Sequence, residues 1–202
     1  MITYQLEQNL YVNITNRCPN RCAFCVRNRK KGLGDAASLW LEQEPSKEEI
    51  LADIERRDLN QYNELVFCGY GEPFERFDDM VWVLQKIRGG TPIPVRINTN
   101  GLGDLINQKP TIPPLRGLVD ALSVSLNASN ADDYDALCRS RYGKAAFDAV
   151  LAFTKEAAEI IPSVTLSVLD TLPAEEIERC RVIAKQCNAA LKIRELIDSA
   201  CS

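Results

Sequence analysis

The sequence contains no histidine, and none of its apolar stretches is long enough to cross a membrane. Without histidine, Ser-His-Asp triads, Cys-His pairs and mixed Cys/His zinc sites are excluded. The first residues, MITYQLEQNLY, lack the basic start and apolar block of a signal peptide, so we expect a cytoplasmic protein with reduced thiols. The net charge of −4 does not favour a nucleic-acid partner.

Cysteine, in contrast, is abundant, with eight residues in a chain of 202. In a reducing compartment these are metal ligands, reactive thiols or core residues rather than disulfides. Three of them, Cys18, Cys22 and Cys25, form the pattern C-x3-C-x2-C in the stretch CPNRCAFC. A structural zinc ion or a cubane iron–sulfur cluster normally takes four ligands, so three thiolates leave one position of a cluster open. Structural zinc and three merely structural cysteines are the alternatives.

Strand-like and helix-like segments alternate along the chain. The predicted strands are residues 10–15, 64–68, 94–98, 118–126, 163–169 and 189–194. Between them lie a capping box at Ser46 and apolar stripes at helical spacing in residues 77–87, 147–161 and 177–187. This order predicts an α/β fold, a partial (β/α)6 barrel with parallel strands and helices outside, in which residues 1–202 form a single domain. A flat doubly wound sheet is the second choice.

The predicted strands alternate between apolar and polar side chains. In ALSVSLN the leucines and the valine point one way, whereas Ser123, Ser125 and Asn127 point the other. The other polar rows are Asn13 and Thr15; Arg96, Asn98 and Asn100; Thr165 and Ser167; and Lys192 and Arg194. Because buried polar groups are costly without partners, we expect these rows to line a cavity that binds a polar ligand. The alternative is an antiparallel sheet with one solvated face.

The turn Gly69-Tyr70-Gly71-Glu72-Pro73 follows the second predicted strand. Its glycines allow the backbone to approach a ligand, and Glu72 can accept a hydrogen bond from an ammonium group. The turn does not fit the dinucleotide-binding pattern G-x-G-x-x-G, because Phe74 occupies the last position and no helix is expected to begin there. Alone, it is equally consistent with an ordinary Gly/Pro turn.

Together, the two motifs resemble those of the radical SAM superfamily, in which C-x3-C-x2-C carries an aromatic residue, here Phe24, before its last cysteine. The resemblance covers roughly residues 10–194. The stretches YVNITNRCPNRCAFC, GYGEP and SLNA look most like the small radical SAM proteins associated with TatD-type metal-dependent hydrolases.

The resemblance implies the cofactors and their ligands. Cys18, Cys22 and Cys25 are expected to hold a [4Fe-4S] cluster, and S-adenosylmethionine (SAM) is expected to bind the fourth iron. The reduced cluster would cleave SAM to methionine and a 5′-deoxyadenosyl radical, which abstracts hydrogen from the substrate. The protein's electron donor would be a flavodoxin or ferredoxin.

The resemblance also implies which residues contact SAM. Its amino group should meet the turn of Tyr70, Gly71 and Glu72, although Tyr70 replaces the first of the two glycines usual in the family. Ser123, Ser125 and Asn127 are implied to hold the ribose hydroxyls, with residues 164–169 beside the adenine. The remaining expected SAM contacts are Phe24, Asn98 and Arg194.

Other charged and sulfur-bearing residues allow two interpretations each. The loop around the cysteines is basic. It would either steer an acidic electron donor toward the cluster or simply be solvated. Its basic residues are Arg17, Arg21, Arg27, Arg29, Lys30 and Lys31. Three cations, Arg96, Lys192 and Arg194, are expected to point inward. They would bind the SAM carboxylate or an anionic substrate. Alternatively, they would form internal ion pairs with Glu64, Glu195 or Asp170. Cys138, Cys180 and Cys187 are expected in the core rather than in a second cluster, and Cys201 in a tail. Cys68 is expected to face the cavity, where its thiol would be a hydrogen-atom donor.

The sequence therefore predicts a radical SAM enzyme acting on a small anionic substrate. The alternatives are an enzyme that installs a radical on a protein partner, a ferredoxin-like electron carrier and a zinc-stapled binding module.

Overall fold

The computed structural model describes residues 1–197, which form a seven-stranded sheet with its strands in chain order. The strands are β1 (Thr3–Leu6), β2 (Asn9–Val12), β3 (Leu65–Phe67), β4 (Val95–Thr99), β5 (Ala121–Ser125), β6 (Ser163–Leu169) and β7 (Ala190–Arg194). All neighbours from β2 to β7 are parallel, as predicted. Only the β1–β2 pair is antiparallel in this part of the chain.

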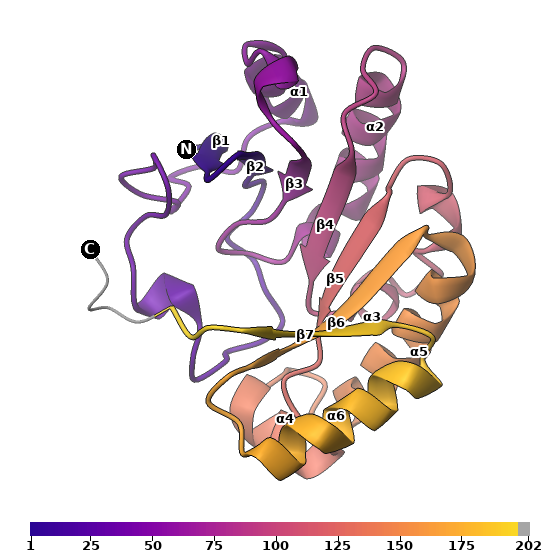
Figure 1. The fold of residues 1–202 in the computed structure, drawn as a ribbon. Coiled ribbons are helices and arrows are strands. Elements are labelled where there is room, and N and C mark those ends of the chain that lie inside the picture. Colours follow the sequence, from indigo (N-terminus) through magenta and orange to yellow (C-terminus); the bar gives the residue numbers. More distant parts are fainter. Residues whose placement is uncertain (198–202) are drawn as a thin grey trace.

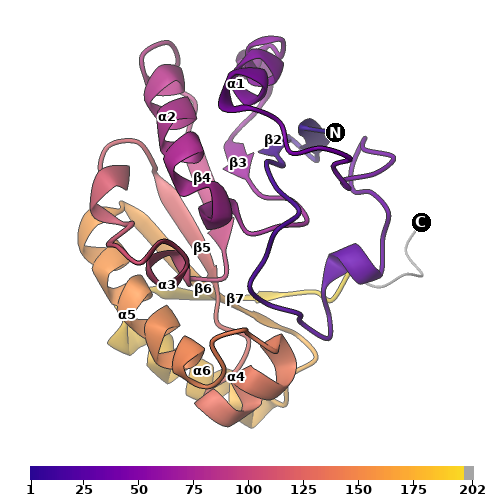
Figure 2. The ribbon, with the colours of Figure 1, turned by 180° about the vertical axis from the view of Figure 1, so that it is seen from behind.

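Helices connect the parallel strands. They are α1 (Lys47–Glu55), α2 (Phe77–Arg88), α3 (Gly103–Asn107), α4 (Ala131–Cys138), α5 (Ala145–Ile160) and α6 (Ala174–Gln186). Figure 2 shows α2, α3 and α5 on the near side of the sheet, whereas the long segment between β2 and α1 lies beyond its edge (Figures 1 and 2). The result is a partial barrel with helices outside. Each helix within residues 1–197 falls short of the length and apolarity needed to cross a bilayer.

Three local predictions were incomplete or wrong. Strand β1 was missed, because its two-residue connection to β2 is Glu7-Gln8, with Glu7 left-handed at φ 54°, and not the Asn-Gly that signals a hairpin. Helices α3 and α4 were missed because both are short, and α4 has only Tyr134 and Cys138 on its buried side. The expectation that no helix begins after the Gly-Glu-Pro turn was wrong.

The Gly-Glu-Pro turn opens directly into helical structure. A 3-10 helix, Pro73–Arg76, follows Glu72, whose side chain accepts a hydrogen bond from the Phe74 amide, and α2 begins at Phe77. Proline suits the first position of such a helix because its missing N–H would be unsatisfied there. The capping box at Ser46 was predicted correctly and opens α1.

The two faces of the sheet differ as the alternation predicts. Ile97, Leu122 and Val124 belong to the buried core under the helices. On the opposite face Asn98, Ser123 and Thr165 are neighbours across three strands, and Ser125 pairs with Ser167 one step further on. The polar rows therefore converge on the inner side of the partial barrel.

The turn after β4 gives a test of the packing. Gly101 has φ +76°, and a Cβ there would lie 2.8 Å from Val124 Cγ1, whereas Gly117 has φ +73° and open space around it. Alanine at either position incurs left-handed strain of about 1–2 kcal/mol. We expect Gly101→Ala to lower the free energy of unfolding by at least about 1 kcal/mol more than Gly117→Ala, because only Gly101 also meets packed side chains. Urea unfolding measures both, and equal losses would contradict the packing argument.

Candidate active site

The three motif cysteines lie together in the loop that follows β2. Cys18, Cys22 and Cys25 are all partly exposed free thiols. The Cys25 amide donates to the Cys22 carbonyl at 3.2 Å, and Cys25 is the N-cap residue of the 3-10 helix Val26–Asn28 without using its side chain as the cap. The backbone thus folds tightly around the cysteines, and the Cys25 sulfur is not used as a helix cap.

The loop is docked on the end of α4. Its Arg21 and Ala23 amides donate to the carbonyls of Cys138 and Leu137, both at 3.0 Å, and the Arg141 amide donates to the Pro19 carbonyl at 2.9 Å. The last carbonyls of a helix have no partner within it, so the loop satisfies them. This docking was not predictable from the cysteine spacing.

The surroundings of all three thiols raise their pKa values. Burial, with the negative charge of Glu72, raises the pKa of Cys18 to about 12. Contact with the Cys138 thiol, followed by burial, raises the pKa of Cys22, and burial raises that of Cys25. Metal binding would therefore displace protons.

The chemistry of the donor set fits an iron–sulfur cluster, since thiolates are its usual ligands. Within residues 1–197, however, no three Cys, Asp or Glu side chains are grouped closely enough to hold one metal ion. A cluster binds each thiolate through a different iron, so its ligands need not meet at one point. All three cysteines belong to one loop, and Cys22 and Cys25 line one cavity.

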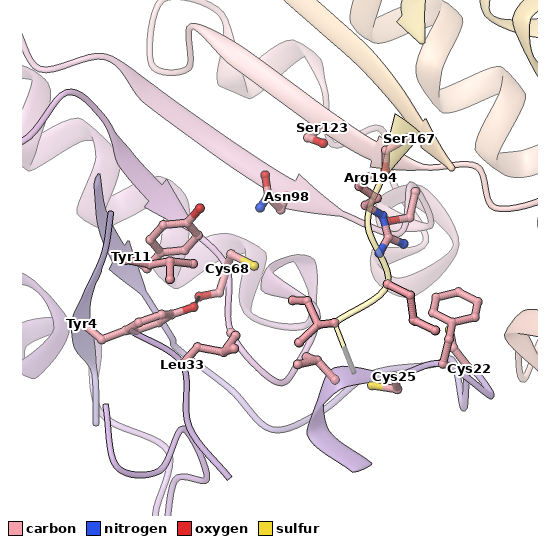
Figure 3. Close-up of a pocket in the computed structure, with 17 residues that line it drawn as sticks. Tyr4, Tyr11, Cys22, Cys25, Leu33, Cys68, Asn98, Ser123, Ser167 and Arg194 are labelled. Atoms are coloured by element: carbon pink, nitrogen blue, oxygen red, sulfur yellow. Dashed lines mark hydrogen bonds between the residues drawn. The ribbon is translucent and has the colours of Figure 1, made fainter. Parts of the chain in front are cut away.

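A cavity of about 330 Å³ separates this loop from the inner face of the sheet. Five predicted SAM contacts line it, namely Phe24, Asn98, Ser123, Ser125 and Arg194. Figure 3 shows Cys22 and Cys25 on one side and Cys68 with the polar strand residues on the other (Figure 3). The expectation that Cys68 faces the cavity is therefore confirmed. Tyr4 of β1, a strand that was not predicted, and Tyr11 of β2, which was predicted, also line the cavity.

Tyr70 points away from this cavity. Its ring is buried in a small cluster with Tyr4, Ala36 and Leu39, and its hydroxyl donates to the Lys30 carbonyl. The role of the ring, which the sequence left open, is to anchor the basic loop. Gly71 allows close backbone packing, because a Cβ there would lie 2.3 Å from the Thr15 carbonyl oxygen.

Glu72 is buried, with 4% of its surface exposed. One carboxylate oxygen accepts from the Thr99 hydroxyl at 2.7 Å and the Phe74 amide at 3.3 Å, and the other accepts from the Asn100 amide at 2.7 Å. Burial outweighs these hydrogen bonds and raises the Glu72 pKa to about 7. Its carboxylate thus joins the Gly-Glu-Pro turn to the end of β4.

Asn127 and Arg194 form a second polar link. Asn127, left-handed at φ 62°, donates to the Cys138 sulfur at 3.4 Å and accepts from Arg194 at 3.0 Å. The Arg194 guanidinium lies over the Phe24 ring, 5.7 Å from its centroid. Within residues 1–197, Arg194 forms no ion pair, because no carboxylate oxygen lies within 4.0 Å of its guanidinium nitrogens. Desolvation by burial lowers its pKa.

The other inward cations behave differently. Arg96 pairs with Glu64 at 2.9 Å and donates to Asn98 at 2.6 Å, so the internal-pairing alternative is correct for it. Lys192 is exposed on the edge strand.

The remaining cysteines mostly fill the core. Cys138, Cys180 and Cys187 are buried as predicted, although Cys138 also contacts Cys22. Cys201 lies outside the described residues.

Comparison with known proteins points to one family. The sequence matches the radical SAM superfamily over residues 12–185. A search of curated proteins finds no match.

Several solved structures are similar in fold. SuiB of Streptococcus suis, bound to S-adenosylmethionine, matches with a TM-score of 0.70 and 15% identity, over 96% of this chain and 40% of SuiB. HydG, a maturase of the [FeFe]-hydrogenase, has a TM-score of 0.66 and 17% identity, over 93% of this chain and 42% of HydG. A radical SAM methyltransferase from Sphaerobacter thermophilus has a TM-score of 0.50 and 18% identity, over 96% of this chain and 68% of its own. The chain thus spans about two fifths of the length of SuiB and HydG.

Glu72 gives a pH-dependent prediction. Because its folded pKa of about 7 exceeds the unfolded value of about 4.3, the native state keeps a proton that the unfolded chain has lost between these values. The contribution of Glu72 to the free energy of unfolding should therefore fall by about 4 kcal/mol as the pH rises through this window, and stay level above it. We expect Glu72→Gln to remove this fall in urea unfolding series.

The matched control is Glu176→Gln. Glu176 is another buried glutamate, but hydrogen bonding to Ser129 lowers its pKa, so its titration has the opposite sign. This variant should keep the fall in stability with rising pH. An unchanged fall in Glu72→Gln would show that Glu72 does not cause it.

Proposed function

The chain belongs to the radical SAM superfamily, and on that premise we propose that it is a radical SAM enzyme whose Cys18, Cys22 and Cys25 hold a [4Fe-4S] cluster. The superfamily uses this cluster together with SAM. When bound, the two cofactors supply a 5′-deoxyadenosyl radical, which removes a hydrogen atom from the substrate. The observation that carries the proposal is the shared cavity, because Cys22 and Cys25 face the polar residues of β4 and β5 across it.

The inner strands would hold SAM. Asn98, Ser123 and Ser125 present hydrogen-bonding groups on the cavity wall, which suits the ribose and the polar groups of the amino acid. Phe24 offers an apolar surface on the opposite side. The backbone of Tyr70 and Gly71, with Glu72, is proposed to meet the amino group, while Asn127 acts by orienting Arg194.

The substrate is proposed to be a small anion. Arg194 supports this, because it is a half-buried cation on the cavity wall whose only hydrogen bond to a side chain within residues 1–197 is to the neutral Asn127 amide. A guanidinium in such surroundings favours a carboxylate or phosphate ligand. The alternative inside the class is activation of a protein partner, which the exposed Ile193 on the edge strand β7 would favour.

Further parts of the proposal rest on the sequence. The stretches YVNITNRCPNRCAFC, GYGEP and SLNA support a place among the small TatD-associated radical SAM proteins, acting beside a TatD-type hydrolase. The basic residues after Cys25 support a flavodoxin or ferredoxin as electron donor. The free thiols of seven cysteines support a reducing, cytoplasmic location. Residues 1–202 are proposed to act as a single radical SAM domain.

Electron paramagnetic resonance (EPR) tests the proposal. We expect anaerobically reconstituted, dithionite-reduced protein to show a [4Fe-4S]+ signal whose shape changes when SAM is added, because SAM would bind one iron directly. Alanine at Cys18, Cys22 or Cys25 should abolish the signal and most of the bound iron. Cys180→Ala is the matched control, because Cys180 is buried on α6 and should leave the signal unchanged.

The alternatives give different results. A cluster signal that does not respond to SAM would indicate a ferredoxin-like electron carrier. Bound zinc without iron or sulfide would indicate a zinc-stapled binding module.

A further inference from the structure

The side chain of Asn100 lies between the turn after β4 and the cysteine loop. Asn100 is 8% exposed, and its Nδ2 atom lies 3.9 Å from the Cys18 sulfur, within hydrogen-bonding distance for sulfur. The two residues are 82 positions apart in the chain. The contact therefore joins two elements that only the fold brings together.

The orientation of the Asn100 amide follows from its second hydrogen bond. Its Oδ1 atom accepts from the Leu102 amide at 2.9 Å. A backbone N–H can only donate, so the oxygen must face Leu102 and the NH2 group must face Cys18. Turning the amide over would place two donors together at Leu102 and an oxygen against the sulfur.

The backbone of Asn100 is held as firmly as its side chain. Its own amide donates to Glu72 at 2.7 Å, and the preceding Thr99 hydroxyl donates to the other oxygen of the same carboxylate at 2.7 Å. The Gly101 amide donates to the Thr99 hydroxyl at 3.0 Å. The donor is thus fixed in place before any ligand binds.

We propose that Asn100 donates a hydrogen bond to the Cys18 thiolate when the cluster is bound, and that this bond raises the reduction potential of the cluster. The inference rests on the proposed function. A donor aimed at a cluster sulfur stabilises negative charge, and the reduced cluster carries one more negative charge than the oxidised cluster. The buried setting strengthens the effect, because electrostatic interactions are weakly screened there. Asn100 makes the cluster easier to reduce without being one of its ligands.

Two substitutions remove the donor and keep the turn. Asn100→Ser retains an oxygen that can accept from the Leu102 amide and is too short to reach the sulfur. Asn100→Asp retains the shape and replaces the donor with an acceptor. We expect both variants to bind a full cluster with a more negative midpoint potential in an EPR-monitored redox titration without SAM, and the aspartate to give the larger shift.

Asn107 provides the matched control. It lies on the neighbouring helix α3, and its amide donates to the carbonyls of Phe74 and Gly103, away from the cysteine loop. Asn107→Ser and Asn107→Asp should leave the midpoint potential at the wild-type value. An unchanged potential in both Asn100 variants would overturn the proposal. Folded Asn100 variants that bind no cluster would also overturn it, because the role would then be retention of the cluster.

A measurement on the wild-type protein does not depend on the variants folding. Asparagine labelled with 15N only at its side-chain nitrogen should give a weak 15N coupling to the reduced cluster in pulsed EPR. Asn100→Ser should lose this coupling although Asn127 carries the same label near Cys138. The label must spare the backbone, because the Asn20 amide also contacts Cys18. Absence of the coupling would overturn the proposal. A wild-type protein without any cluster would instead refute the proposed function.

Discussion

The fold depends on the cost of burying polar groups without partners. Leu122 and Val124 pack in the core beneath the helices, whereas Ser123 and Ser125 on the same strand face the other way. Helices on both faces would bury these hydroxyls against apolar side chains, so the helices cover one face and the polar rows face the cavity. Because β1 and β7 end the strand order without pairing to each other, the barrel stays open on this side. The alternation in the strands therefore creates the cavity.

Glu72 then connects the loops around that cavity. It caps the helical turn Pro73–Arg76 and also accepts hydrogen bonds from Thr99 and Asn100 at the end of β4. A buried carboxylate is stable only when its oxygens are hydrogen-bonded, so the two turns are held together. The raised pKa of Glu72 is the consequence of placing such a group out of water. Since Asn100 approaches Cys18, this link extends from the Gly-Glu-Pro turn to the cysteine loop.

The sequence predicted those parts of the molecule that have a strong local pattern. The six parallel strands, the cap at Ser46 and the polar rows were found because alternation and capping act within a few residues. Strand β1 and helix α4 were missed, because a Glu-Gln hairpin turn and an eight-residue helix leave weak signals. The docking of the cysteine loop on α4 could not be predicted, because it joins residues more than 100 positions apart, as in the bond from Arg21 to Cys138.

The cysteine loop is anchored at two places, one between its thiols and one after the last of them. Before Cys25, Arg21 and Ala23 cap the carbonyls of α4, and after it the hydroxyl of Tyr70 holds Lys30. Tyrosine in place of the usual glycine thus supplies an anchor that glycine lacks. Burial raises the pKa values of Cys18 and Cys25, so binding of their thiolates to a cluster would displace protons. The two anchors fix the backbone of the loop, so the positions of its thiols follow from contacts with α4 and with Tyr70.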